Sequence, residues 1–91
     1  MSKEVFAPII HERCLLMARA EAEAVCQQPD LGEDIYNAWL TMDANQPEDF
    51  DLTEWIDELS GKYRINSHQV SALFESIRVI ILQYDDLIDS I

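Results

Sequence analysis

The most suggestive spacing of chemical groups in the chain lies in DANQPEDFDLTEW, residues 43–55. Side chains that carry oxygen stand at its first, third, ninth and twelfth places: Asp43, Asn45, Asp51 and Glu54. An EF-hand loop binds calcium from these places, but it needs glycine at the sixth place, where this chain has Glu48. Its fifth place, which is also a ligand position, holds Pro47, which has no side-chain oxygen. We therefore expect no dedicated metal or cofactor site here, and we interpret Asp51 and Glu54 as caps of the following helix. The alternative to a calcium loop is weak, unselective binding of cations by the clustered carboxylates.

The acidic side chains are concentrated in one part of the chain. The net charge is −12 at pH 7, yet no Lys, Arg or His occurs from Ala20 to Gly61. We expect this segment to present its carboxylates on one side of the molecule without neighbouring counterions. Such a surface repels nucleic acid and anionic lipid and attracts a basic partner. The alternative is that the acidity only keeps the protein in solution.

The predicted partner-binding surface combines these acids with two aromatic residues, Tyr36 and Phe50, which fall outside the main apolar stripes. Exposed aromatic side chains surrounded by charge are typical of binding hot spots. The residues expected to contact the partner are Glu33, Asp34, Tyr36, Asp43, Glu48, Asp49, Phe50, Asp51, Glu54, Asp57 and Glu58.

No pattern of residues indicates catalysis. His11 and His68 are isolated in the sequence, and the two glycines cannot form a phosphate-binding loop. Cys14 and Cys26 are expected in one helix, about 18 Å apart along its axis, which is too far for a disulfide. Unpaired cysteines fit a reducing compartment, and the longest apolar run is too short to cross a membrane. We expect a non-enzymatic, cytoplasmic protein.

The elements that must position these residues are four helices of one all-α domain spanning residues 1–91. Residues 8–28 are rich in helix formers, and this helix should end before Pro29. Its apolar stripe is Leu15, Ala18, Ala22, Val25 and Cys26. The next helix should be capped by Asp30 with Glu33, and carries apolar residues at helical spacing: Leu31, Ile35, Ala38, Trp39 and Met42. We expect the 8–28 helix to pack on an acidic helical core formed by residues 31–88.

The third predicted helix follows Asp51 and should stop near Gly61. Its apolar stripe is Leu52, Trp55, Ile56, Leu59 and Tyr63. The last, about 68–88, should be capped by Asn66 and Ser67, and its apolar stripe is Val70, Leu73, Phe74, Ile77, Ile81, Tyr84 and Ile88. Val79, Ile80 and Leu82 lie outside that stripe, so this helix is either central to the fold or shared with a partner, and a homodimer through it is one interpretation. The two helices also match a helix-turn-helix, with Arg64 in place of the usual turn glycine.

Residues 31–82 resemble the IscX-type iron–sulfur cluster assembly adaptor family. The resemblance lies in LGEDIYNAW, DLTEWIDEL and the apolar LFESIRVIIL, and its matched residues are Gly32, Glu33, Tyr36, Ala38, Trp55, Ile56 and Leu59. It implies a winged-helix-like domain that docks its acidic face on a basic patch of a cysteine desulfurase. It also implies weak binding of ferrous iron through carboxylates, here Glu33, Asp43, Asp51 and Glu58. The acidic run that follows in that family is replaced by GKYRIN, and the first predicted helix has no counterpart in it.

These observations favour a protein-interaction module that docks on a basic surface of a partner protein, with the iron–sulfur adaptor as its most specific form. One alternative is a small acidic inhibitor, or DNA mimic, that blocks a nucleic-acid-binding protein. A second alternative is a helix-turn-helix regulator, although six basic residues against eighteen acids offer little to bind phosphates.

Overall fold

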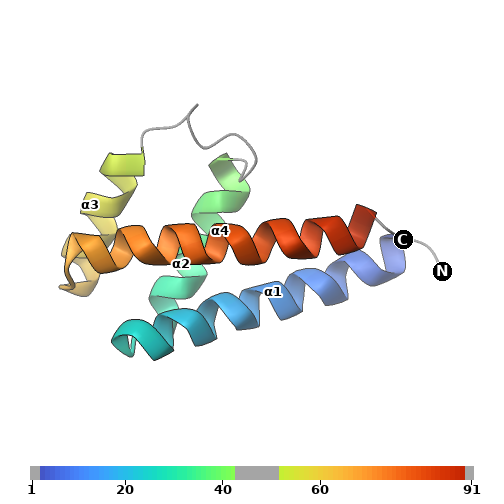
Figure 1. The fold of residues 1–91 in the computed structure, drawn as a ribbon, viewed down its shortest axis with the longest axis horizontal. Coiled ribbons are helices and arrows are strands. Elements are labelled where there is room, and N and C mark those ends of the chain that lie inside the picture. Colours follow the sequence, from blue (N-terminus) through green and yellow to red (C-terminus); the bar gives the residue numbers. More distant parts are fainter. Residues whose placement is uncertain (1–2, 43–51, 90–91) are drawn as a thin grey trace.

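The computed structural model describes residues 3–42 and 52–89, which form four α-helices. They are α1 (Lys3–Cys26), α2 (Pro29–Met42), α3 (Leu52–Tyr63) and α4 (Ser67–Asp89). The two long helices, α1 and α4, run side by side in opposite directions, and α2 and α3 run across them (Figure 1). The prediction of an all-α, four-helix domain is confirmed. The described ranges contain no β-strand, and therefore no wing of a winged-helix fold.

The boundary between α1 and α2 differs from the prediction. Helix α1 begins at Lys3 rather than residue 8, so that Pro8 lies inside it. Pro29 opens α2, because proline lacks the N–H that a first helical residue leaves unbonded. Asp30 is therefore a first-turn residue of α2 and not its cap. The chain reverses through Gln27, whose φ is 60°, a left-handed conformation typical of a helix C-terminus.

The turn between α3 and α4 is fixed by hydrogen bonds. Helix α3 continues past Gly61 to Tyr63, and Arg64 takes the left-handed conformation, with φ of 56°. The backbone N–H of Ile65 donates to the carbonyl of Ser60 at 3.2 Å, the bond that closes a Schellman motif. The prediction that Asn66 caps α4 is confirmed, since its Oδ1 accepts a 2.7 Å bond from the N–H of His68.

The core lies where α2 crosses α1 and α4. Trp39 is its largest side chain; its ring meets Phe74 edge-on at 5.7 Å, and its Nε1–H donates to the Phe74 carbonyl at 2.9 Å. The apolar stripes predicted the buried residues of α2 and α4 well: Leu31, Ile35, Ala38, Trp39, Val70, Leu73, Phe74, Ile77 and Ile81. In α1 the buried residues are Cys14, Ala18 and Ala22, whereas Val25, predicted on the same stripe, is exposed.

Both cysteines are free. Cys14 is buried between the helices, and that burial, with the nearby charge of Asp85, raises the pKa of its thiol to about 11. Cys26 is half-buried, and its Sγ–H donates to the Ala22 carbonyl. Within the described ranges, no helix is both long and apolar enough to cross a membrane.

Candidate functional site

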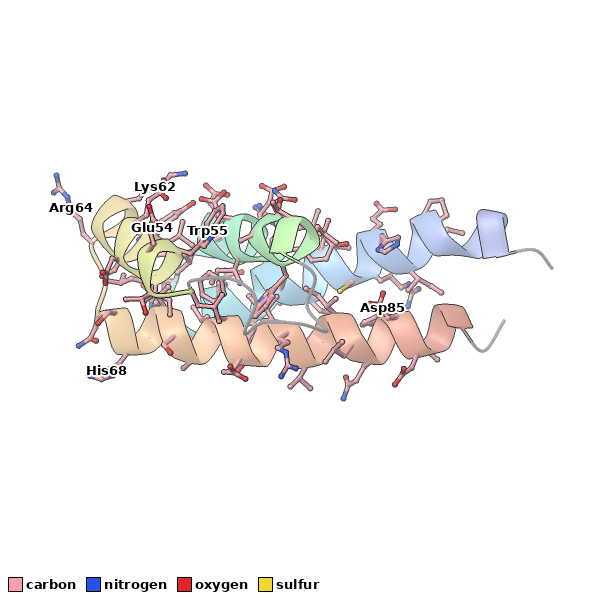
Figure 2. All side chains as sticks on the ribbon, turned by 90° about the horizontal axis from the view of Figure 1, so that it is seen from above. Glu54, Trp55, Lys62, Arg64, His68 and Asp85 are labelled. Atoms are coloured by element: carbon pink, nitrogen blue, oxygen red, sulfur yellow. The ribbon has the colours of Figure 1, made fainter. Side chains whose placement is uncertain are left out.

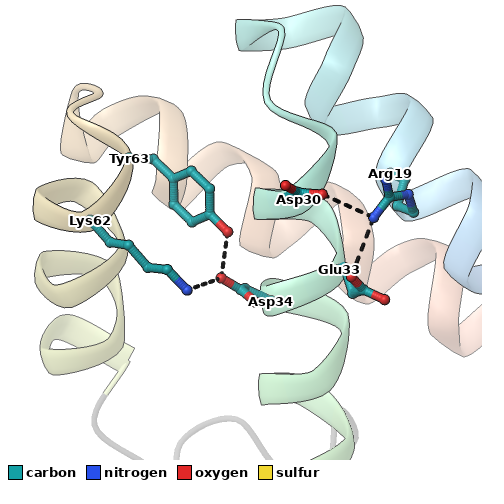
Figure 3. Close-up of polar contacts among 6 residues, drawn as sticks. All are labelled: Arg19, Asp30, Glu33, Asp34, Lys62 and Tyr63. Carbon is teal, nitrogen blue, oxygen red and sulfur yellow. Dashed lines mark hydrogen bonds and ion pairs between the residues drawn. The ribbon is translucent and has the colours of Figure 1, made fainter.

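The contact between α2 and α3 is polar and is built around Asp34. Tyr63 donates its hydroxyl to Asp34 Oδ2 at 2.5 Å, and Lys62 donates from Nζ to the same oxygen at 2.9 Å (Figure 3). Burial of the Asp34 carboxyl group opposes its ionisation, but these two hydrogen bonds outweigh that cost and lower the pKa of Asp34. Burial together with the bond to Asp34 raises the pKa of Tyr63. Asp34 is therefore a charged anchor that holds α3 against α2.

One other predicted site acid, Glu33, faces α1, together with Asp30, which is not among the predicted site residues. Arg19 lies 3.3 Å from Asp30 and 3.3 Å from Glu33, and bridges the two carboxylates (Figure 3). The expectation that the acidic segment has no local counterions is wrong for α2, because the fold brings to it the bases that flank the segment, Arg19 and Lys62. The residues with uncompensated charge are consequently fewer than the sequence suggested.

The remaining predicted acids of known position lie together on α3. Asp57 and Glu58 follow Glu54 by three and four residues, which places all three on one side of the helix. All three are exposed. We call this set the acidic α3 face. Figure 2 shows Glu54 on the side of the molecule that also carries Trp55 and Lys62, away from α4. None of the three makes an ion pair with another residue in ranges 3–42 and 52–89.

A pocket of about 260 Å³ separates α2 from α3 beside the acidic α3 face. We call it the α2–α3 pocket; its lining is Asp34, Asn37, Ala38, Thr41, Trp55, Glu58, Leu59 and Lys62. The half-buried indole of Trp55 provides an apolar wall, while Asn37 and Glu58 provide oxygen acceptors. An aromatic wall next to carboxylate oxygens is suited to a guanidinium or ammonium group, through cation–π contact and charged hydrogen bonds.

Tyr36 was predicted as an exposed anchor, and this prediction is wrong. Its side chain is only 5% exposed, because α2 is covered by α1 as well as by α4. Its hydroxyl lies 3.3 Å from His11 Nδ1 and donates to the His11 carbonyl at 3.4 Å. Burial, with the charges of Cys14 and Asp85, raises the pKa of Tyr36 to about 12. Tyr36 thus belongs to the packing of α1 on α2.

Five predicted site residues lie outside the described residues: Asp43, Glu48, Asp49, Phe50 and Asp51. Most of the calcium-loop spacing lies there too, and so do two of the four acids that the family resemblance proposes for iron. Among the residues that are described, no three His, Cys, Asp or Glu side chains are grouped closely enough to hold a metal ion.

Sequence reasoning missed three residues that shape the site. Trp55 was assigned to an apolar stripe, and Lys62 and Tyr63 were not considered as partners of Asp34. Trp55 and Lys62 are seven residues apart, which places both side chains on one side of α3. This spacing was the only feature of the sequence that could have shown that they line the same site. The ion pair from Lys62 to Asp34 spans 28 positions, and no local pattern predicts it.

The turn after the C-terminal end of α3 carries the features that suggested a DNA-binding motif. Arg64 and His68 are both exposed and project from the turn at this end of the molecule (Figure 2). Arg64 occupies the left-handed position that the missing turn glycine usually takes. Helix α4 buries its Val70 and Leu73 in the core and runs for 23 residues. The helix–turn–helix connection is present, but its exposed basic side chains, Lys62, Arg64 and His68, all lie near the turn between α3 and α4.

The chain as a whole was compared with known proteins. No protein-family model, curated protein sequence or solved structure matches it. The functional argument therefore depends on the geometry of the site.

Proposed function

We propose that this protein is a non-enzymatic interaction module that docks on a basic surface of a partner protein through the α2–α3 pocket and the acidic α3 face. The observation that carries the proposal is the position of Trp55, half-buried in a pocket that Glu58 and Asp34 line with carboxylates. A cationic side chain that enters the pocket meets an aromatic ring and charged acceptors together. Neither group alone gives this combination of affinity and selectivity.

The charges around the pocket favour an extended basic surface over a single cation. Asp34 is already bonded to Lys62 and Tyr63, so the charge left for a ligand comes mainly from Glu58. Glu54 and Asp57 continue the negative surface away from the pocket along α3. Exposed charges of this kind increase the association rate and select the sign of the partner, while the pocket supplies a local anchor.

The more specific form of this proposal is an adaptor that docks on the basic patch of a cysteine desulfurase, as the resemblance to the iron–sulfur adaptor family suggests. Of the residues that carry the resemblance, Glu33, Trp55 and Ile56 are partly exposed, whereas Gly32, Tyr36, Ala38 and Leu59 are buried. Support for the adaptor therefore comes from the few exposed positions. A nucleic-acid-binding protein, blocked by imitation of phosphate charge, is the alternative partner.

The test uses the fluorescence of the full-length chain during titration with a short arginine peptide. Trp39 is 1% exposed and Trp55 half-exposed, so a ligand in the pocket changes the emission of Trp55 alone. The double variant Glu54→Gln/Glu58→Gln should weaken binding about tenfold, equivalent to ~1.4 kcal/mol. The matched control Glu12→Gln/Glu75→Gln makes the same chemical change at two exposed glutamates on α1 and α4 and should leave affinity almost unchanged.

Equal weakening by both double variants would show that only net charge matters, and would contradict a site on α2 and α3. Replacement of Trp55 by Phe should abolish the fluorescence response while retaining binding measured by calorimetry. Affinity purification at low and high salt then identifies the partner, because exposed charge pairs are screened beyond about 10 Å at 0.1 M salt. Recovery of a desulfurase favours the adaptor, and recovery of a nuclease or polymerase favours the inhibitor.

A further inference from the structure

Helix α1 has a second apolar surface outside the stripe that faces the core. Three large apolar side chains of this surface are exposed to solvent: Ile9 at 50%, Leu16 at 58% and Met17 at 48%. A surface helix of a small protein normally carries one apolar stripe, directed to the core. Contiguous exposed apolar surface on a soluble helix typically marks an interaction site.

The pattern of this surface is that of an antiparallel helix pair. Ile9, Arg13, Leu16, Ala20 and Glu23 follow one another at alternating intervals of four and three residues, which keeps them on one line along the helix. All five are exposed, and we call them the outer stripe of α1. A groove of about 450 Å³ lies between α1 and α4. It is lined by three residues of the outer stripe, Arg13, Leu16 and Ala20, by Met17, which is also on α1, and by Tyr84 of α4.

The outer stripe is complementary to itself. In a twofold contact, residue i of one copy meets residue j of the other, and j meets i. When two copies of α1 pack antiparallel about residue 18, Leu16 meets the partner's Ala20, and Arg13 meets the partner's Glu23. The small side chain of Ala20 leaves room for Leu16, and each of the two Arg13–Glu23 pairs brings opposite charges together.

The position of the stripe also avoids the strongest repulsion. Up to Ala20, α1 contains Lys3, Arg13 and Arg19 against Glu4 and Glu12, so bases outnumber acids in this part of the acidic chain. The acidic α3 face lies on a different helix, whose principal contacts are with α4 and α2. Two copies can therefore meet through α1 without bringing their most acidic surfaces together.

We propose that the outer stripe of α1 binds a second copy of the same chain, in an antiparallel α1–α1 dimer centred on residue 18. This differs from the dimer through the last helix that the sequence suggested. Val79 and Leu87 of α4 are exposed as well, at 49% and 54%, but Gln83, which lies between them on that side, is uncharged and offers no complementary pair like Arg13 and Glu23. The proposal is independent of the partner that the α2–α3 pocket binds.

Sedimentation equilibrium of the full chain tests the dimer through a charge exchange. Arg13→Glu and Glu23→Arg should each raise the dissociation constant at least about tenfold, since the twofold axis makes each substitution create two like-charge contacts. The double variant Arg13→Glu/Glu23→Arg should return the constant to near the original value. The two single variants change net charge in opposite directions, so an effect of overall charge would move the constant in opposite directions too.

A hydrophobic pair of variants separates the two helices. Leu16→Glu should give a monomer, whereas Val79→Glu, at a similarly exposed residue of α4, should leave the dimer intact. Circular dichroism verifies that each variant retains its helicity. A monomer at the highest protein concentration that stays in solution would overturn the proposal. So would a double variant as weak as the single ones, or a dimer that Val79→Glu disrupts and Leu16→Glu does not.

Discussion

Helix α2 packs on α1 and on α3 in opposite ways. Toward α1 the contact is close and dry: Gly32 is buried against the Ala18 backbone, and Tyr36 is buried beside Cys14. Toward α3 the contact is polar and incomplete: Asp34 bonds to Tyr63 and Lys62 above a pocket that remains open. The first contact leaves no room for a ligand. The second holds the helices apart on charged groups, which is how a small all-helical protein can keep a recess on its surface.

The largest effect should come from filling the close contact. A Cβ atom on Gly32 would lie 2.2 Å from the carbonyl oxygen of Ala18, a backbone atom that can move only if the two helices separate. Gly32→Ala should therefore lower the free energy of unfolding by about 3 kcal/mol, the upper part of the usual range for overpacking. Denaturation in urea, followed by circular dichroism, measures the change.

Gly61→Ala is the matched control for that substitution. No atom lies within 4 Å of the position that its Cβ would take, and the residue is inside α3. Since alanine is the better helix former, this variant should gain about 0.8 kcal/mol of stability. If the two alanine variants gave changes of the same sign and size, the distinction between the two sides of α2 would have no energetic basis.

The next effect concerns the charge in the open contact. Asp34→Asn removes the ionised acceptor of Tyr63 and Lys62 and should cost about 1.5 kcal/mol at neutral pH, the order of a hydrogen bond to a charged group. Asp57→Asn, on the acidic α3 face, should change stability by less than about 0.5 kcal/mol. Measurement of both variants by urea denaturation at pH 7 tests this difference.

The difference in stability between the wild type and Asp34→Asn should depend on pH. The pKa of Asp34 is lower in the folded protein than its ordinary value of 3.8, so the unfolded chain takes up a proton first as pH falls. The advantage of the wild type over Asp34→Asn should thus be full above the ordinary pKa and should disappear as pH falls through the lowered one. An advantage that grew on acidification would mean that Asp34 is destabilised by its surroundings.

The smallest effects come from two tyrosine hydroxyls on the two sides of α2. Tyr63→Phe removes a 2.5 Å bond to a carboxylate and should cost about 1 kcal/mol, and Tyr36→Phe removes longer bonds to His11 and should cost about 0.5 kcal/mol. Thermal unfolding of both variants gives the comparison. The reverse order would indicate that the buried hydroxyl of Tyr36 contributes more than its bond lengths suggest.

The sequence predicted the helices and most of the core, because an apolar stripe at helical spacing is a local property of the chain. Leu31, Ile35 and Trp39 are buried where their spacing placed them, and Asn66 caps α4. The burial of Tyr36 was not predictable in this way. It falls outside the stripe of α2, and it is buried only because a second helix covers that side, which depends on how the helices pack.

The charged part of the site was predicted with less success, for a similar reason. The absence of bases from Ala20 to Gly61 is a fact of the sequence, but the fold places Arg19 and Lys62, which flank this segment, next to its carboxylates. The acids of α3 kept their predicted exposure because their spacing opposes them to the apolar stripe of their own helix. Charges whose partners lie on other helices could not be assigned without the fold.

The buried thiol of Cys14 makes the opening of the molecule measurable. Only a thiolate reacts readily with disulfide reagents, and a side chain with 2% exposure and a pKa of about 11 is protected from them on both counts. Cys26, half-exposed near the end of the same helix, should react first and serve as an internal reference. The rate at which Cys14 is labelled then reports how often α1 separates from its neighbours, so that local unfolding can be followed without introducing a new residue.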